Sequence, residues 1–483
     1  MKKLYFVLFL SALMLATNFI FAQTLSKKPG NQNKLIKNHP SVNMTDNLND
    51  SQKPVRQNIS NYDNIKRIDP GYINDHITAN WYVDPLGTDN VSHGTGTGVN
   101  AFKTIQYAIN FTGVFAGDII NIAAGTYVEN VTLNKSLHLI GSGASTILIP
   151  AFSDVGLPDP TTGGSFRGSQ MIVVSASNVE IAYIKIDGNN PSLTSGYVKH
   201  GVDIDARNGI ITADPGPYTN VVVHHCTVQN IYLRGIYART SDVNFNFHDN
   251  TVKNVDGCYS SIAMFNFGGS GIFANNTVDL ANDAVSSNWS TGTQYLNNTI
   301  TNSGSGIHTD NNGGFGGVAD LADGNNISNC SYGIFSFFPY FAPTIQNNTI
   351  FNADVGLHAW GGQTIPVSTI FTNNNVDCNN KPGSCGILVY TGEPVVWYWV
   401  GNVSATFTNN IIKNDIYIAD VENYGTYTAN STLHNNSFIN GPSGFVAVGA
   451  TVNAQNNWWG TTDSLSIASL IHGAMNWIPW IGK

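Results

Sequence analysis

The side chains best suited to chemistry are a few charged residues that recur at fixed places in a repeating segment. Lys253 and Asp279 each follow the apolar residue of consecutive repeat copies, and the turns that come next add Arg234, Asp256 and Asp283. Carboxylate oxygens are ligands that Ca²⁺ prefers, and a lysine whose pKa is lowered by neighbouring charge can accept a proton. The catalytic candidates are Lys253, Arg234 and Asp279, and the metal-binding candidates are Asp256, Asp279 and Asp283.

A plainer interpretation of these charges stays open. Lysine and aspartate that face each other across neighbouring strands form an ordinary solvated ladder, in which each pair contributes only a few tenths of a kcal/mol. Six of the twelve Lys and Arg residues in 77–483 lie between 185 and 253, which favours a local belt that attracts anions. The 26 Asp and Glu residues still give this part a net charge of about −14, which argues against nucleic acid or an anionic membrane as partner.

A repeat in the second half of the chain must position these groups. Its apolar residue recurs at intervals of 22 to 36 residues, and in eight of nine copies an Asn stands two positions earlier. Periods of this length indicate a solenoid, and a stacked Asn amide can bond the amides above and below it. The nine apolar positions are Val228, Val252, Val278, Ile300, Ile327, Ile350, Val376, Ile412 and Phe438.

A second strand follows most copies, as in 306–309 and 356–359, and each such strand begins with Gly. We expect this Gly to open a corner through its conformational freedom, after which side chains alternate inward and outward. No helix separates the strands, so each period is predicted to form one coil of a β-helix. A single amphipathic helix is expected within 101–110, ahead of the strands, where it would plug one end.

The outward positions of the second strand carry rings and charge. Aromatic faces exposed in line are what sugar rings stack on, so these positions are predicted to bind substrate. Coverage by a loop such as 338–343 is the alternative. The substrate-binding candidates are Arg239, Tyr237, His308, Phe335, His358 and Trp360.

The first residues of the chain predict export, and a leader and a folded domain are predicted to follow them. Residues 1–22 have the charged start, apolar run and small-residue end of a signal peptide, with an uncleaved anchor helix as the alternative. Residues 23–77 are rich in Asn and Lys and predict a flexible leader, and 78–483 form the folded domain with a closing coil at about 452–483. Among the five cysteines, Cys378 and Cys385 could close a short loop as a disulfide.

The repeats resemble those of the right-handed parallel β-helix, or pectin-lyase-like, superfamily. The entry segments 81–84 and 123–130 and the final segment 456–463 are similar to the first and last coils of its secreted bacterial members. The resemblance implies an all-β fold, a single right-handed parallel β-helix of roughly 11–13 coils with a short N-terminal capping helix. It covers residue 78 to the C-terminus and is weak evidence for a reaction, because the superfamily includes lyases, hydrolases, epimerases, binding proteins and adhesins.

Through this resemblance the leading hypothesis is a Ca²⁺-assisted polysaccharide lyase or epimerase that acts on a uronic-acid-containing glycan outside the cell. The alternative is a non-catalytic glycan-binding surface or matrix protein, an adhesin. A polygalacturonase-type hydrolase is disfavoured, because only Asp283 matches the Asp-Asp pair of those members. We expect a monomer, secreted or held at the cell surface, with no membrane span in the mature chain and an extracellular polysaccharide as partner.

Overall fold

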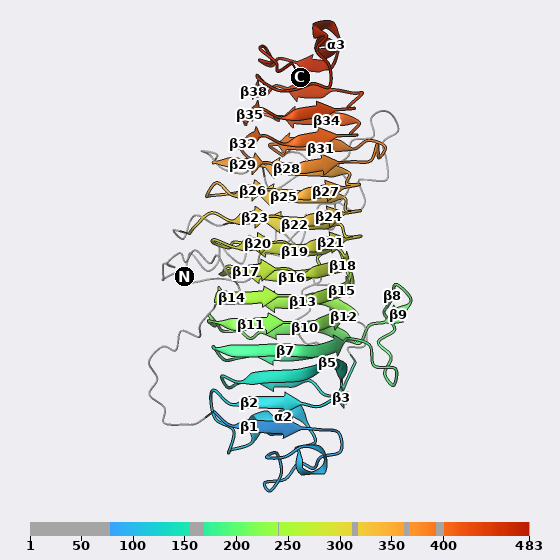
Figure 1. The fold of residues 1–483 in the computed structure, drawn as a ribbon, viewed down its shortest axis with the longest axis vertical. Helices are drawn as coiled ribbons and strands as arrows, with labels where there is room; N and C mark the ends of the chain where they lie inside the picture. The colour runs from blue at the N-terminus through green and yellow to red at the C-terminus, as the bar shows by residue number, and fades with distance from the viewer. Residues whose placement is uncertain are drawn as a thin grey trace, which may run out of the picture. The chain divides into compact units, whose positions relative to one another are not determined.

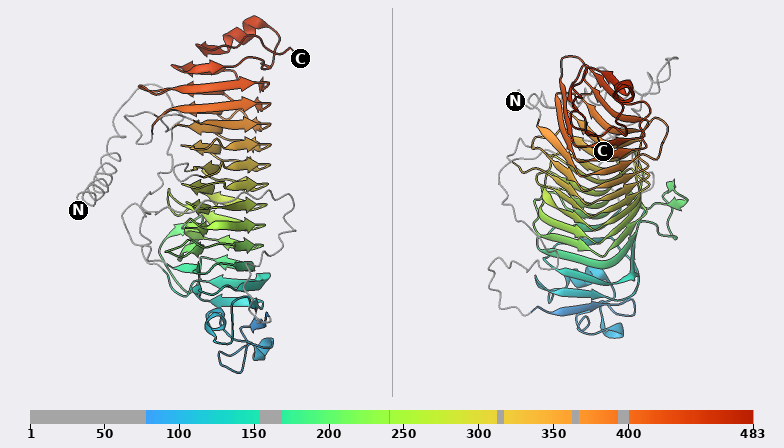
Figure 2. Two further views of the ribbon diagram at one scale, coloured as in Figure 1. Left: turned by 90° about the vertical axis from the view of Figure 1, so that its left-hand side faces the viewer. Right: turned by 45° about the horizontal axis from the view of Figure 1, so that its top comes forward.

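The computed structural model describes residues 78–153, 169–239, 241–311, 317–361, 367–392 and 400–482. The predicted signal peptide and leader therefore lie outside the described residues. Within them the chain is a parallel β-helix whose coils stack along one long axis (Figures 1 and 2). No helix in the described ranges is long and apolar enough to cross a membrane.

Thirteen strands in sequence order form one parallel sheet, which we call sheet B, and their number lies within the predicted range of coils. Each strand pairs with the corresponding strand of the previous and the next coil. The strands of sheet B are β4 (Val131–Leu133), β6 (Gln170–Val174), β10 (Ala206–Thr212), β13 (Ile231–Ala238), β16 (Ile262–Phe267), β19 (Asp283–Asn288), β22 (Ser305–Thr309), β25 (Tyr332–Phe337), β28 (Val355–Trp360), β31 (Cys385–Tyr390), β34 (Tyr417–Glu422), β37 (Phe445–Val448) and β39 (Ile471–Gly473).

The other 24 paired strands form sheet A, which contains two parallel rows of strands separated by a turn. In the first row lie β1 (Asn80–Val83), β2 (Ile119–Ile122), β5 (His138–Ile149), β7 (Val179–Asp187), β11 (Val221–His224), β14 (Val243–His248), β17 (Ser270–Ala274), β20 (Gln294–Leu296), β23 (Leu321–Asp323), β26 (Thr344–Gln346), β29 (Ser368–Thr372), β32 (Val403–Thr408), β35 (Ala429–His434) and β38 (Thr451–Asn453). The second row, which also pairs with β5 and β7, contains β3 (Gly125–Val128), β12 (Thr227–Gln229), β15 (Thr251–Val255), β18 (Thr277–Ala281), β21 (Thr299–Thr301), β24 (Asn326–Ser328), β27 (Thr349–Phe351), β30 (Asn375–Asp377), β33 (Ile411–Lys413) and β36 (Ser437–Ile439).

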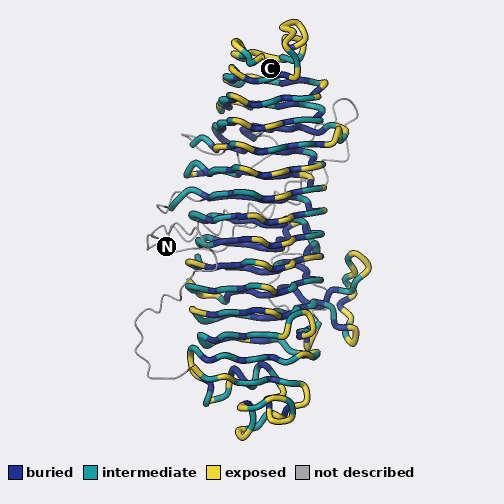
Figure 3. Tube along the Cα trace, viewed as in Figure 1, coloured by how far each residue is buried: buried dark blue, intermediate teal, exposed yellow. Residues whose placement is uncertain are grey.

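The register confirms the repeat read from the sequence. All nine apolar positions pair in one unbroken column from Val228 to Phe438, and each is at most 1% exposed. Because alternate residues of a strand point to opposite faces, this column places one row of side chains in the core and the flanking rows outside. Figure 3 shows buried residues along the strands and many exposed ones in the turns.

Asparagine makes many of the turns between the strands. In the coil at 294–309, Asn297 and Asn302 have φ of 52° and 51°, the left-handed conformation that Asn tolerates better than other side chains with a Cβ. Between them, the buried Asn298 bonds the amides of the neighbouring coils, as predicted. The frequent Asn residues thus set both the bends of the chain and the contacts between coils.

The glycines that open the second strand lie where predicted, but the reason predicted for them, conformational freedom at a corner, is wrong. Gly306 and Gly333 do not have positive φ. A Cβ at Gly306 would lie 2.4 Å from the carbonyl oxygen of Gly333, and a Cβ at Gly333 would lie 2.5 Å from that of Gly356. These glycines are needed because the backbones of adjacent coils approach too closely for a side chain.

Short helices lie near both ends of the described domain. The predicted N-terminal helix is present as α2 (Ile105–Asn110), capped by the hydroxyl of Thr104, and it contacts β1, β2 and β4 (Figure 1). At the other end α3 (Ser464–Ser469) precedes β39, and the carboxylate of Asp463 caps it. A separate antiparallel hairpin of β8 (Val198–Lys199) and β9 (Val202–Asp203) projects from the side of the coils.

Candidate functional site

The charged residues predicted to act together divide between the two sheets. Lys253 in β15 and Asp279 in β18 are in register on sheet A, as the repeat predicted. The carboxylate of Asp279 accepts hydrogen bonds from the hydroxyl of Thr301 and the amide of Asn302, each at 2.7 Å. Lys253 is exposed. This pair therefore has the geometry of a solvated ladder across strands.

Arg234 and Asp283 lie on sheet B instead. They occupy one column of outward positions, two strands apart, with Ile262 between them. The guanidinium carbon of Arg234 lies 4.9 Å from the ring centre of Phe265 and 5.7 Å from that of Tyr237. Burial lowers the pKa of Arg234 from its ordinary value. A guanidinium is nevertheless not deprotonated in proteins, so Arg234 is a fixed cation on aromatic rings and cannot serve as a base.

Asp256 belongs to neither group. It lies in the turn between β15 and β16, where its Oδ2 is 3.0 Å from Nζ of Lys199 and 3.2 Å from Nε2 of His200. Lys199 is part of the hairpin strand β8 and His200 follows it, so the ion pairs tie the hairpin to the coils. This contact explains Asp256 without any ligand.

The three carboxylates predicted to hold Ca²⁺ do not converge. Asp279 lies on sheet A, Asp283 lies on sheet B with 1% exposure, and Asp256 is paired with cations. Among the residues that the structure describes, no group of three or more His, Cys, Asp or Glu side chains is arranged to hold a metal ion. The carboxylates predicted as ligands therefore do not fit a bound cation.

The disulfide that Cys378 and Cys385 could have formed is absent. Cys378 and Cys385 are both free thiols and both buried. The sulfur of Cys378 faces the backbone oxygen of Cys385 at 3.9 Å, and that of Cys385 faces the backbone oxygen of Ile387 at 2.9 Å.

The predicted substrate-binding rings do line up on the outward side of sheet B. His308, Phe335 and His358 are in register on β22, β25 and β28, and their successive ring centres are 4.9 and 4.6 Å apart. A second column continues from Trp360 to Tyr390, with ring centres 5.2 Å apart. We call the rings of His308, Phe335, Phe337, His358, Trp360 and Tyr390 the ring stack.

The prediction that these rings are exposed is wrong. His308, Phe335, His358 and Trp360 are between 1% and 3% exposed. Tyr237 is also buried, stacked on Phe265 at 4.9 Å, and Arg239 is paired with Asp214 at 3.3 Å. The sequence pattern correctly placed the rings on the outward face but could not show that this face is covered.

Burial perturbs the ionisable groups of the ring stack. It lowers the pKa of His358 to about 3, with the neighbouring His308 adding to the effect, so His358 is neutral at physiological pH. Nδ1 of His308 lies 3.8 Å from Oδ2 of Asp283, and the hydroxyl of Ser305 donates to the other oxygen of that carboxylate. Arg234, Asp283 and His308 therefore share sheet B, and the last two are close enough to interact.

Sequence reasoning did not predict that two carboxylates would be buried with raised pKa values. Burial raises the pKa of Asp320 to about 6 and that of Asp310 well above its ordinary value, with Asp320 adding to the latter effect. A histidine cluster also lies on the outward side of sheet A around His224 and His248. The interval of 24 residues between these two equals that between Val228 and Val252, so extending the repeat alignment to them could have found the pair.

Comparison with known proteins supports the fold. No protein-family model matches the chain. The catalytic domain of a GH87 α-1,3-glucanase has a TM-score of 0.52 at 14% identity, over 82% of this chain and 70% of that one. Two further similar structures are a polygalacturonase from Erwinia carotovora, with a TM-score of 0.49 at 11% identity over 70% of this chain and 94% of that one, and the A-module of a mannuronan C-5 epimerase from Azotobacter vinelandii, with 0.44 at 14% over 78% and 93%.

One curated relative matches in sequence. A cell surface glycoprotein of Methanothermus fervidus is 25% identical over 346 residues, which are 70% of this chain and 46% of the relative. The chain thus spans about half the length of that protein. The glucanase domain and the register of the coils together confirm the resemblance to the pectin-lyase-like proteins at the level of the parallel β-helix fold.

Proposed function

We propose that this protein binds an extracellular polysaccharide along the outward face of sheet B. The observation that carries the proposal is the ring stack, whose rings follow one another over β22, β25, β28 and β31. The faces of sugar rings pack on aromatic rings. Two overlapping columns of rings, which together cover four coils, suit a chain of sugars better than a single small molecule, because neighbouring coils present neighbouring rings.

The proposed ligand and location agree with the similar proteins. The glucanase, the polygalacturonase and the epimerase are named for reactions on polysaccharides, and the relative from Methanothermus fervidus is a cell surface glycoprotein. A secreted or surface-held protein would meet such polymers outside the cell. The ring stack already makes contacts in the structure, so a glycan must replace those contacts when it binds.

Binding is favoured over catalysis by the division of the predicted catalytic set. Lys253 and Asp279 lie on sheet A, whereas the ring stack lies on sheet B. A general base must come within about 3 Å of the proton that it removes. A sugar held on the ring stack cannot meet that condition for Lys253, because the two groups belong to different sheets.

The binding proposal is tested with purified protein and a panel of soluble polysaccharides in affinity electrophoresis. Phe335→Leu and Trp360→Leu remove the rings but keep apolar side chains, so we expect each to weaken binding at least about tenfold, the equivalent of about 1.4 kcal/mol. A Lys253→Ala, Asp279→Ala double variant alters sheet A and serves as the matched control. Loss of binding in that control, with full binding by the ring variants, would place the ligand on sheet A.

A uronan lyase or epimerase is the second candidate, and one observation favours it. Arg234, which could hold a uronate carboxylate, shares sheet B with the pair of Asp283 and His308 at 3.8 Å. A lyase would produce an unsaturated sugar whose absorbance is measured near 235 nm, and an epimerase would change the uronate ratio seen by NMR. Either activity, abolished by His308→Gln and retained in Lys253→Ala, would replace the binding proposal. Absence of both over a uronan panel would exclude this candidate.

A further inference from the structure

A cluster of imidazoles and carboxylates lies on the outward side of sheet A, away from the ring stack. The carboxylate of Glu180 on β7 contacts Nδ1 of His138 at 2.5 Å and Nε2 of His224 at 2.9 Å. Nδ1 of His224 contacts Nδ1 of the next residue, His225, at 2.8 Å. These side chains come from three successive strands, β5, β7 and β11, and the turn after β11.

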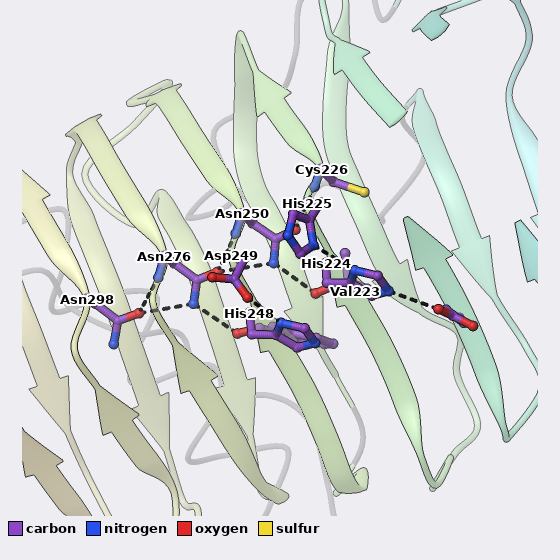
Figure 4. A network of polar contacts seen from close by, with 11 residues as sticks. Val223, His224, His225, Cys226, His248, Asp249, Asn250, Asn276 and Asn298 are labelled. Carbon is purple, nitrogen blue, oxygen red and sulfur yellow. Dashed lines mark hydrogen bonds and ion pairs between the residues drawn. The ribbon is translucent and has the colours of Figure 1, made fainter. Parts of the chain in front are cut away.

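The next coil extends the cluster. His248 on β14 stacks on His224 with ring centres 4.9 Å apart and ring planes within 2° of parallel. Nδ1 of His248 lies 2.7 Å from Oδ2 of Asp249. Figure 4 shows His224, His225, His248 and Asp249 close to the stacked Asn250, Asn276 and Asn298. We call His138, Glu180, His224, His225, His248 and Asp249 the histidine cluster.

The contact between His224 and His225 can hold only one proton between its two Nδ1 atoms. A hydrogen bond between two Nδ1 atoms needs one protonated nitrogen and one bare nitrogen. Glu180 is an acceptor for Nε2 of His224, which leaves Nδ1 of neutral His224 as the acceptor for His225. If both rings become imidazolium, two N–H groups face each other at 2.8 Å and the contact must open. Protonation of both rings would therefore break this contact and free the exposed His225.

The charge of the cluster also changes sign with pH. The neighbouring hydrogen bonds from His138 and His224 lower the pKa of Glu180, so this carboxylate stays ionised in mild acid. Burial lowers the pKa of His248, so this ring takes up its proton at a lower pH than an ordinary histidine does. The cluster sets two carboxylates among four imidazoles, and histidine is the side chain whose charge changes between about pH 5 and about pH 8. Protonation of all four imidazoles would give the cluster a net positive charge.

The charges around the cluster do not cancel this change. Along β7, Lys185 and Asp187 are paired with each other at 3.4 Å. Among the described residues, Tyr183 is a further ionisable group in contact with the cluster, and its ring stacks on His225 with centres 4.8 Å apart. Tyr183 is 40% exposed, in contrast to the buried rings of sheet B. An exposed aromatic face can pack against a sugar ring, and imidazoles that have taken up a proton can pair with the carboxylate of the same sugar.

We propose that Tyr183 and the histidine cluster form a second glycan site, which takes carboxylate-bearing chains such as uronans and holds them more tightly as the pH falls. The sugar ring packs on Tyr183, and its carboxylate pairs with the imidazolium groups of His225 and His248. The inference rests on the proposed function in that its ligand is a polysaccharide. It adds an anionic ligand class, a second location and a dependence on pH.

The test measures binding of oligogalacturonate and of a neutral glucan oligomer by calorimetry at about pH 7.5 and about pH 5, the range over which histidine titrates. Wild-type protein should bind the uronate at least about tenfold more tightly at the lower pH, and the neutral glucan equally at both. A His225→Gln, His248→Gln double variant should lose the gain. His472→Gln changes an exposed histidine on the distant strand β39 and should keep it.

The outcomes separate this inference from the proposed function. An affinity that does not rise in acid, or a rise that survives in the double variant, overturns the inference. If binding does not change with pH but is lost in Trp360→Leu, the proposed site on sheet B is supported and the site at the histidine cluster is not. Uronate binding confined to acid and lost in the double variant supports the histidine cluster and contradicts the sheet B site. If His472→Gln also lost the increase in affinity at low pH, that increase would not come from the histidine cluster.

Discussion

Oδ1 of Asn298 accepts two hydrogen bonds from Asn276 on the preceding coil, one from its backbone N–H and one from its side-chain amide, each at 3.0 Å. The same pair of bonds joins each Asn of the column to the next, as far as Asn457. All of these amides are buried. The coils between Asn250 and Asn457 are thus joined by a polar ladder inside a tight turn.

Replacing one member of this ladder should destabilise the protein strongly. Asn298→Ala leaves two donors of Asn276 without an acceptor in a buried place, and each such loss costs about 1–3 kcal/mol. We expect the free energy of unfolding in urea to fall by about 2–4 kcal/mol. Thr299→Ala, an exposed position beside it, should change it by less than about 0.5 kcal/mol. Equal effects of the two substitutions would show that the ladder is not a source of stability.

This ladder is the part of the fold that the sequence predicts best. The period of the apolar residue and the Asn two places before it were visible because every coil repeats the same local contacts. The reason for the Gly at 306 was not visible, because it depends on the carbonyl of Gly333 one coil away. Spacing along the chain shows which residues share a column, but not how closely two backbones approach.

The buried His358 should make the protein sensitive to acid. Its pKa is about 3 in the folded protein and about 6.5 in an unfolded chain, so between these values only the unfolded chain binds the proton. Stability is therefore lost as the pH falls from about 6.5 to about 3, by up to about 4 kcal/mol. His358→Phe keeps an aromatic ring between Tyr332 and Phe335 and should flatten this loss in urea unfolding. An unchanged slope would show that His358 takes up a proton while folded.

Asp415 should have the opposite dependence on pH. Its side chain is 0% exposed, and burial raises its pKa to about 8. Between about pH 4 and about pH 8 the folded protein holds a proton that the unfolded chain releases, so stability falls as the pH rises through that window. The amide of the Asp415→Asn variant cannot ionise, so the variant should be more stable than wild type at about pH 8. Its advantage in free energy of unfolding should grow by about 1.4 kcal/mol for each pH unit between about pH 4 and about pH 8.

The control for that comparison is Asp214→Asn, which alters a carboxylate that is 53% exposed. It should leave the pH dependence of the urea midpoint unchanged. If Asp415→Asn behaves in the same way as this control, then Asp415 is ionised in the folded protein and its burial is relieved by a contact that the structure does not show.

The candidate site could be predicted only in part. The outward row that contains Lys253 and Asp279 followed directly from the repeat. Arg234 and Asp283 were wrongly grouped with them, because the chain turns from sheet A to sheet B between these positions and the spacing does not show the bend. The histidine cluster was missed because Glu180 comes before the region where the repeat is easy to recognise.

The central claim, that a polysaccharide lies on the ring stack, is tested most directly by hydrogen–deuterium exchange with and without a bound glycan. Binding there must order β22, β25, β28 and β31, so we predict slower amide exchange in these strands on adding the tightest ligand of the panel at about pH 7.5. The paired strands β15 and β18 of sheet A provide the comparison within the same molecule. Protection confined to sheet A, with no change in β25 and β28, would contradict the account.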